Sequence, residues 1–317
     1  MSLNKSYLIS RRIYVNSIRL KCPATVANLG AGFDVFGLAL KEPYDVIEVE
    51  KLDSGIEIQV EGYDVPKNPE ENTGGYVALR MIRDFTLNSG VKLKIIKRIK
   101  PGSGLGSSAA TAAGVAYALN EIYRLNLSLD ALVEYASLGE TVSAGVAHAD
   151  NVAPALYGGF TIIASRKPLK VLCFKPPEVG IVVALPHVEK GSTRIAREVL
   201  PKHIPLEHMV KNVAYASTLV AGIVSGNIDL IKMGMNDCVV EPARAKAGIL
   251  KGFTLFKEVG VKVGAGVAAS GAGPAVIGLI EKHLVDELYN AFEEVCRVLG
   301  LSYTVYKTEP GNGVCRL

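Results

Sequence analysis

The sequence predicts a protein of the α+β class with two domains. Its 317 residues give room for two domains of ordinary size. Strand-like and helix-like runs occur in both halves of the chain, and a stretch rich in proline and lysine at 166–177 is typical of a hinge. We therefore expect a first domain over 1–167 and a second over 168–317.

Composition limits the kind of protein this is. Hydrophobic residues make up 49% and charged residues 21%, as in a well-packed soluble globule, and a net charge of +4 without a long basic block disfavours nucleic acid. Five scattered cysteines without a C-x-x-C pair indicate neither disulfides nor zinc, which favours the cytosol. The segment 1–12 lacks the apolar centre of a signal peptide. The longest uncharged run, 263–280, has too many glycines for a helix facing lipid, so no membrane partner is expected.

In the first domain, hydrophobic periodicity and capping residues predict the elements. Asn72 and Ser128 stand where helices would be capped, and Asp130 lies in the first turn after Ser128. The residues 22–34, with several glycines, are interpreted as a long turn. Strands are expected at 13–21, 44–51, 55–60, 91–99 and 158–164. Helices are expected at 76–86, 109–125 and 128–139, with Glu140 beginning a further segment.

The second domain has a similar mixture. A buried strand is expected at 181–185, and a helix that begins near Ser192 ends on Pro201. Helices at 207–225 and 228–235 carry mostly core-type residues. A glycine-rich loop at 270–274, a strand at 275–280, a helix at 282–299 and a strand at 303–308 complete an α+β unit.

The most informative stretch is the loop at 101–111, with the sequence PGSGLGSSAAT. Glycines allow successive N–H groups to point into one hollow, and a helix that starts at Ser107 or Ser108 adds its positive dipole end. This combination favours phosphate binding. The loop has neither the Gly-Lys-Ser/Thr of a Walker A motif nor the spacing of the dinucleotide fingerprint. Lys97 and Lys100 flank the loop, and either could reach a nucleotide or lie at a solvated strand end.

Several polar residues outside the loop are candidates for chemistry. Glu140 stands among small and apolar residues, where a buried carboxylate needs a partner such as a metal. His148, Asp150 and Asn151 lie within four residues, but a metal triad would need a second histidine at helical spacing. A guanidinium matches a carboxylate in two hydrogen bonds, and Arg197 and Arg244 are candidates for that role. Thr193 and Arg197 share one helical face.

Three motifs together show a family resemblance. The loop resembles the ATP-binding motif of the GHMP kinases of small molecules. The string PATVANLGAGFD at 23–34 and the His-x-Asp-Asn at 148–151 are similar to motifs of homoserine kinases. The chain departs from the usual pattern at Val26 and Ala31, where the family has Ser and Pro. The resemblance implies a first domain like domain 2 of ribosomal protein S5 and a ferredoxin-like second domain.

The resemblance also implies roles for individual residues. The ATP-binding set is Asn72, Lys97, Pro101, Gly102, Ser103, Gly104, Leu105, Gly106, Ser107, Ser108, Ala109, Ala110 and Thr111. Mg²⁺ would be held by Ser108 and Glu140. The substrate-binding set is Asn28, Asp34, His148, Asp150, Thr193, Arg197, Arg244 and Gly271. Asn28 and Asn151 would be the catalytic pair, although Asn151 cannot take a proton, so the substrate hydroxyl would attack directly.

The activity implied is ATP-dependent phosphorylation of the L-homoserine hydroxyl to O-phospho-L-homoserine in threonine biosynthesis, by a cytoplasmic homodimer. The alternatives are a sister kinase for mevalonate, shikimate or threonine, and a metabolite sensor without catalysis. Either Asp34 or Asp150 would pair the substrate ammonium.

Overall fold

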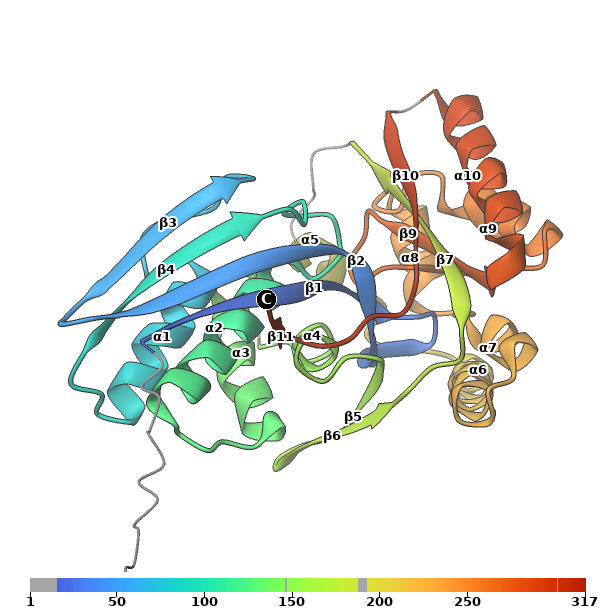
Figure 1. The fold of residues 1–317 in the computed structure, drawn as a ribbon. Helices are drawn as coiled ribbons and strands as arrows, with labels where there is room; N and C mark the ends of the chain where they lie inside the picture. The colour runs from blue at the N-terminus through green and yellow to red at the C-terminus, as the bar shows by residue number, and fades with distance from the viewer. Residues whose placement is uncertain (1–15, 146, 188–192, 301) are drawn as a thin grey trace, which may run out of the picture.

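A computed structural model describes residues 16–145, 147–187, 193–300 and 302–317 of the chain. It confirms the α+β class: two sheets are each packed against helices (Figure 1). No helix in the described ranges is both long and apolar enough to cross a membrane.

The first sheet is mixed. Its strands are β1 (Ser17–Asn28), β2 (Gly32–Leu52), β3 (Ile56–Gly62), β4 (Gly90–Lys97), β5 (Phe160–Arg166), β6 (Leu169–Phe174) and β11 (Cys315–Arg316). The order is β11-β1-β2-β4-β3, and β5 and β6 extend it from β2. Because β2 is 21 residues long, its second half pairs with β4 while its first half pairs with β5.

Helices cover one face of this sheet. They are α1 (Thr73–Asp84), α2 (Ser107–Tyr123), α3 (Leu129–Ala144) and α4 (Val152–Tyr157). The alanine-rich α2 lies between α1 and α3 and against β1 and β2, because small side chains allow close approach on all sides. The predicted caps are confirmed: Asn72 accepts from two N–H groups of α1, and Ser128 accepts from Ala131.

The second sheet is antiparallel, with the order β10-β7-β9-β8. Its strands are β7 (Val179–Pro186), β8 (Gly266–Ala269), β9 (Val276–Glu281) and β10 (Tyr303–Thr308). Helices separate β7 from β8 and β9 from β10, so the unit is the predicted ferredoxin-like βαββαβ arrangement. The helices are α5 (Thr193–Glu198), α6 (Leu206–Ser225), α7 (Ile228–Gly234), α8 (Val240–Lys246), α9 (Phe253–Lys262), the 3₁₀ turn η1 (Lys282–Leu284) and α10 (Val285–Leu299).

Strand β7 joins two hydrophobic cores. Ile181 and Val183 belong to the core shared with the first sheet, whereas Val182 and Ala184 face the core under α9 and α10. Successive side chains of a strand point to opposite faces, so a strand covered on both faces is apolar throughout. This explains the uninterrupted run from which the strand was predicted.

Two predicted loops are partly regular structure. The stretch 22–34, interpreted as a long turn, continues β1 as far as Asn28, and only 29–31 separate it from β2. The expected hinge at 166–177 contains β6, which pairs with β5 in the first sheet. Both segments combine turn residues with apolar residues that a sheet can bury, and the pairing strands outweigh the local turn preference.

Two helical predictions also need correction. Helix α3 runs on to Ala144, so Glu140 lies inside it and does not begin a new segment. The helix over 207–225 exists, but it is not a core helix over its whole length. One row of its apolar side chains is exposed: Leu206 71%, Val210 57%, Val213 58% and Val224 62%.

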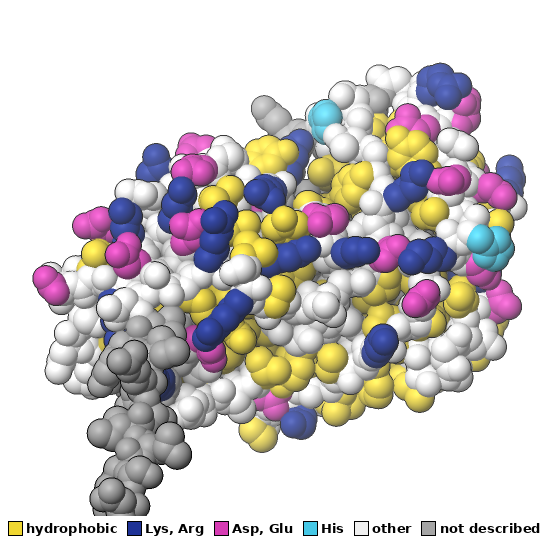
Figure 2. All heavy atoms as spheres, viewed as in Figure 1, with side chains coloured by type: hydrophobic (Ala, Val, Ile, Leu, Met, Phe, Trp, Pro, Cys, Tyr) yellow, Lys and Arg dark blue, Asp and Glu magenta, His cyan; other side chains and the backbone are white. Residues whose placement is uncertain are grey.

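Basic and acidic side chains are interleaved over the face shown in Figure 2. Ion pairs such as Lys21–Glu42 and Lys41–Glu309 lie on the surface around β1 and β2. The positive charge there is therefore largely compensated locally.

Candidate active site

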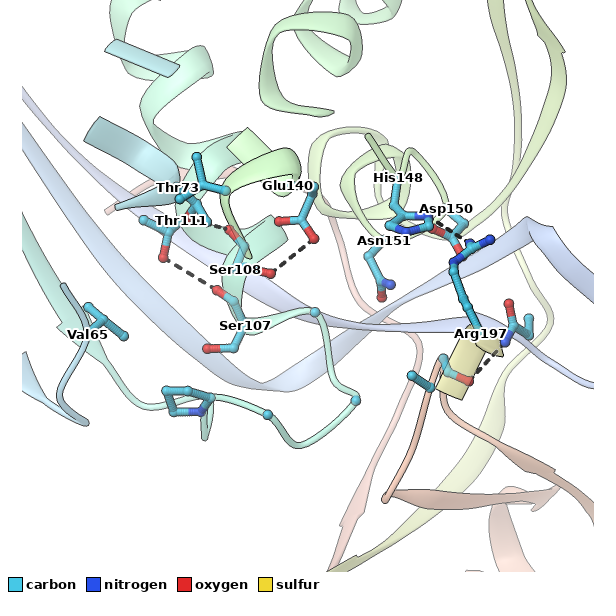
Figure 3. A pocket seen from close by; sticks show the side chains of 18 of the residues that line it. Val65, Thr73, Ser107, Ser108, Thr111, Glu140, His148, Asp150, Asn151 and Arg197 are labelled. Carbon is cyan, nitrogen blue, oxygen red and sulfur yellow. Dashed lines mark hydrogen bonds between the residues drawn. The ribbon is translucent and has the colours of Figure 1, made fainter. Parts of the chain in front are cut away.

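The candidate site is a cavity of about 360 Å³, lined by strands of the first sheet and by helices and a loop that connect strands of the second. The size suits a small-molecule site. Groups from the phosphate loop, α1 and α3 lie at one end, here called the nucleotide end. The side chains of His148, Asp150, Asn151 and Arg197 gather at the other, the substrate end (Figure 3).

The nucleotide end is formed mainly by backbone. Gly102, Gly104 and Gly106 have φ angles of +75°, +83° and +63°, a region that favours glycine. Gly106 is the N-cap of α2 and provides no capping side chain, so the first N–H groups of α2 have no side-chain cap. The helix begins at Ser107, as predicted, and this arrangement is suited to a phosphate group.

A loop from the second sheet supports the phosphate loop. Ser270 Oγ donates to the Gly104 carbonyl at 2.6 Å, and the Ala275 N–H donates to the Ser103 carbonyl at 3.1 Å. A Cβ at Gly104 would lie 2.6 Å from the Ser270 carbonyl oxygen. The glycine is therefore required for this close approach as well as for its φ angle.

Lys97 borders the cavity, but its ammonium is engaged by the protein. It donates to the Asp45 carboxylate, to the Ser107 carbonyl at 2.7 Å and to Thr111 Oγ1 at 3.1 Å. An ammonium has three hydrogens, so these acceptors use all of them. The lysine expected to reach ATP thus holds the start of α2 instead. Its partner Asp45 is 52 positions away in sequence, which no local pattern could reveal.

The other residues of the predicted ATP-binding set fall into two groups. On the cavity wall lie Asn72, Pro101, Gly102, Gly104, Gly106, Ser107, Ser108 and Thr111. Off the wall and buried lie Ser103, Leu105, Ala109 and Ala110. The side chains of Ala109 and Ala110 face the protein interior because a helix that lines a cavity on one side packs on its other side, whereas Ser103 and Leu105 lie in the loop before that helix. They shape the loop, and their side chains do not reach the cavity.

Ser108 and Glu140 come together as predicted. Ser108 Oγ donates to Glu140 Oε2 at 3.0 Å, and both line the cavity beside the start of α2 (Figure 3). A hydroxyl and a buried carboxylate are hard oxygen donors that fit Mg²⁺, which completes its shell with phosphate and water oxygens. No cluster of three His, Cys, Asp or Glu side chains suited to a metal occurs within the described ranges.

An ion pair dominates the substrate end. Arg197 Nη2 donates to both carboxylate oxygens of Asp34, at 2.5 and 2.7 Å, and lies 3.1 Å from His148 Nδ1. A guanidinium only donates, so Nδ1 accepts and the neutral imidazole carries its proton on Nε2. Burial and the charge of Arg197 lower the pKa of His148, in agreement with the neutral form.

A second guanidinium lies close by. Arg244 is 3% exposed and donates to the carbonyls of Ala196, at 3.1 Å, and Gly271, at 2.6 Å. Arg197 and Arg244 both approach the ring of Phe33, with centroid distances of 5.2 and 5.5 Å. Burial and the neighbouring Arg197 lower the pKa of Arg244. Two adjacent cations of this kind favour an anionic ligand.

Asp150 is the second carboxyl group at this end. It is buried, and burial together with the charge of Asp34 raises its pKa to about 6. The N–H groups of Asp150 and Asn151 partly offset that rise. Either this group or Asp34 is placed to meet a ligand cation.

Asn28 stands at the end of β1 with a φ angle of +76°. Its Oδ1 accepts from the Asp34 N–H at 3.3 Å, a bond within the turn that joins β1 to β2. Its Nδ2 also donates to the Gly271 carbonyl at 3.0 Å, so the side chain joins the two sheets. One N–H of the amide remains for a ligand.

The structure therefore brings together most of the predicted substrate set. Asn28, Asp34, His148, Asp150, Arg197, Arg244 and Gly271 all line the cavity. The side chain of Thr193 lies outside the described residues, although its backbone begins α5. Phe33 was not predicted as a site residue. The sequence feature that could have indicated it is the position of an aromatic residue between Gly32 and Asp34, inside a glycine-rich motif.

Comparison with known proteins agrees with this geometry. The family of the GHMP kinases N terminal domain matches residues 74–159. The homoserine kinase of Methanococcus maripaludis is 48% identical over 94% of this chain and 98% of its own length, and that of Methanocella arvoryzae is 40% identical over 95% and 97%. The crystal structure of homoserine kinase from Cytophaga hutchinsonii superposes with a TM-score of 0.88 at 34% identity, covering 95% of this chain and 98% of that one.

A glycine-rich loop at a helix start, between an S5-like sheet and a ferredoxin-like sheet, is the architecture of a GHMP kinase. With near full-length identity of 40–48% to curated relatives, the chain belongs to the homoserine kinase family.

Proposed function

We propose that this protein transfers the γ-phosphoryl group of ATP to the hydroxyl of L-homoserine, giving O-phospho-L-homoserine for threonine biosynthesis. The observation that carries the proposal is the bonded pair Asp34–Arg197 in the cavity, with Arg244 close to it. An α-amino acid brings one ammonium and one carboxylate. It replaces each half of the protein's ion pair with a charge of the right sign.

The pair also explains selectivity. A ligand with a carboxylate alone separates Asp34 from Arg197 and leaves the Asp34 charge without a partner, at a cost of several-fold to many-fold in affinity. Mevalonate and shikimate are ligands of that kind. An amino acid with a free side-chain hydroxyl satisfies both charges, so homoserine and threonine fit this end best.

At the nucleotide end, the N–H groups around Gly104 and at the start of α2 would bind the ATP phosphates. Ser108 and Glu140 would hold Mg²⁺, which supplies positive charge to the phosphate oxygens when bound. Asn72, beside the start of α1, would lie at the adenine. We propose these contacts from the cavity wall and from the family resemblance.

The proposed chemistry uses no protein base. Asn151 cannot accept a proton, and the lone pair on His148 Nδ1 is directed at Arg197. The residues therefore act by alignment and charge: Asp34 or Asp150 orients the ammonium, Arg197 and Arg244 orient the carboxylate, and the remaining N–H of Asn28 contacts the hydroxyl. Phosphoryl transfer through a loose transition state needs mainly such positioning.

The first test is ADP release with Mg²⁺ and ATP against a panel of alcohols. It contains homoserine, threonine, shikimate, mevalonate, 4-hydroxybutyrate, which lacks the ammonium, and 3-aminopropan-1-ol, which lacks the carboxylate. We expect a strong preference for homoserine. Turnover of another alcohol would identify a sister kinase, and ATP binding without any turnover would favour the metabolite sensor.

A substitution of Arg197 tests the site itself. Arg197→Met should raise the homoserine KM about a hundredfold, the scale of a lost charged hydrogen bond, while the ATP KM changes less than about threefold. Arg166→Met is the matched control, since the exposed Arg166 donates to the backbone carbonyl of Asp34. An unchanged homoserine KM in Arg197→Met would remove this arginine from the substrate end.

We propose in addition a cytoplasmic homodimer. All five cysteines are free thiols, as expected in a reducing compartment. The exposed apolar row on α6 supports a contact between copies, because such rows commonly mark interfaces. Sedimentation equilibrium of the wild type and of Val213→Asp would test the dimer, which the variant should weaken.

A further inference from the structure

Thr25 is a buried residue of β1 that the proposed chemistry does not yet use. It is fully buried, and its hydroxyl donates to Asn151 Oδ1 at 2.9 Å. Its N–H donates to the Leu105 carbonyl in the phosphate loop at 3.1 Å. One residue of the first strand thus contacts both the loop and the asparagine at the substrate end.

The hydroxyl determines which half of the Asn151 amide can meet a ligand. Because Oδ1 accepts from Thr25, this oxygen faces β1, and the NH₂ group is the half of the amide that points away from Thr25. Its nitrogen lies toward the loop at Gly271, 4.0 Å from the position that a Cβ there would occupy. Asn151 is therefore presented as a donor.

Gly106 makes room for this contact. A Cβ at Gly106 would lie 2.0 Å from Thr25 Oγ1 and 3.1 Å from Asn151 Oδ1. The glycine that caps α2 is thus also the position that admits the hydroxyl. The loop, Thr25 and Asn151 pack as one unit.

We propose that Thr25 is a positioning residue for phosphoryl transfer: its hydroxyl holds the Asn151 carboxamide so that the N–H groups face the reacting oxygens. Donors fixed in this way stabilise the charge on the transferring group without reorganising during the reaction. This inference rests on the proposed function for its kinetic consequence, whereas the orientation of Asn151 is a property of the protein alone.

Three variants test the proposal. Thr25→Val keeps the shape of the side chain and removes the hydroxyl, and Thr25→Ser keeps the hydroxyl. Asn151→Ala removes the amide oxygen that accepts from this hydroxyl. We expect Thr25→Val to lower kcat about tenfold or more, with the ATP KM within about twofold, and Thr25→Ser to recover most of the loss. In the Asn151→Ala background, Thr25→Val should cause no further loss. The proposal would be overturned if Thr25→Val and Thr25→Ser lowered kcat equally, or if Thr25→Val lowered kcat further in the Asn151→Ala background.

A second measurement does not depend on the substrate. The side-chain NH₂ signals of Asn151 in a ¹H–¹⁵N spectrum, assigned by their absence in Asn151→Ala, should move in Thr25→Val and stay in place in Thr25→Ser. Unmoved signals in Thr25→Val would contradict the orienting role even if homoserine proves not to be the substrate. If wild-type protein leaves homoserine unphosphorylated while the signals move as expected, the proposed function fails and the role of Thr25 stands.

Discussion

The two ends of the cavity present different kinds of chemical group to a ligand. At the nucleotide end the groups offered to a ligand are chiefly backbone N–H groups, shaped by Gly102, Gly104 and Gly106. At the substrate end they are charged side chains, with Asp34 and Arg197 bonded to each other. One end recognises a phosphate chain by its shape and charge, and the other recognises the separation of two opposite charges.

This difference determines how each end tolerates change. The backbone geometry depends on a few positions where any side chain would collide with its neighbours. Substitutions at the nucleotide end should therefore strain the backbone and lower the stability of the protein. The paired charges of the protein can be exchanged for the charges of a ligand. Substitutions at the substrate end should therefore weaken ligand binding, with less effect on the stability of the protein. Three substitutions test that contrast, beginning with the largest expected effect.

Lys97→Met should destabilise the protein by about 3–5 kcal/mol, because it leaves the Asp45 carboxylate buried without its cation. Asp45 would keep the N–H groups of Arg98 and Ile99, which donate to its other oxygen. Chemical denaturation measures the free energy of unfolding. The double variant Asp45→Asn/Lys97→Met should recover part of the loss, since an amide oxygen still accepts those N–H groups. A double variant less stable than Lys97→Met would contradict a buried-charge cause.

Gly104→Ala should cost about 2–3 kcal/mol of stability and raise the ATP KM about tenfold, because its Cβ meets the backbone of Ser270 and Gly273 at a φ of +83°. Gly226→Ala is the control, with a φ of +71° and open space around its Cβ. It should cost about 1 kcal/mol and leave both KM values unchanged. If Gly104→Ala behaves like this control, the close approach of the two loops has no role in shaping the phosphate site.

Asp150→Asn should separate stability from binding at the substrate end. The folded-state pKa of about 6 lies above that of the unfolded chain, so the unfolded state ionises first and stability is lost as pH rises from about 4 to about 6. Above that range the carboxylate costs on the order of 3 kcal/mol, which the amide avoids. At pH 7 the variant should be more stable, while its homoserine KM rises.

The wild type provides the matching pH profile. If Asp150 orients the ammonium, kcat/KM for homoserine should fall as pH drops below about 6, and this decline should vanish in Asp150→Asn. A decline that persists in the variant would show that Asp150 is not the group that orients the ammonium.

The sequence was informative wherever function is encoded locally. The helix start at Ser107 and the cap at Asn72 follow from short motifs whose chemistry acts over three or four residues. The pairing of Ser108 with Glu140 followed from the resemblance, since each side chain alone has an ordinary structural interpretation. Strand β7 was predictable because burial on both faces leaves a continuous apolar run.

What could not be predicted depends on contacts distant in sequence. Lys97 was assigned to the nucleotide because Asp45, on a different strand, gave no sign of meeting it. Thr25 was passed over because its partner Asn151 is 126 positions away. The apolar residues of α6 looked like core residues, since composition alone does not tell which side of a helix is covered.

The carbonyl of Gly271 has a consequence beyond the shape of the site. It accepts from Asn28 and Arg244 at the substrate end, while the adjacent Ser270 supports Gly104 at the nucleotide end. A ligand that draws Arg244 toward itself therefore acts on the same short loop that supports the phosphate-binding backbone. Thermodynamic reciprocity then applies: by whatever factor homoserine changes the affinity for ATP, ATP changes the affinity for homoserine by the same factor.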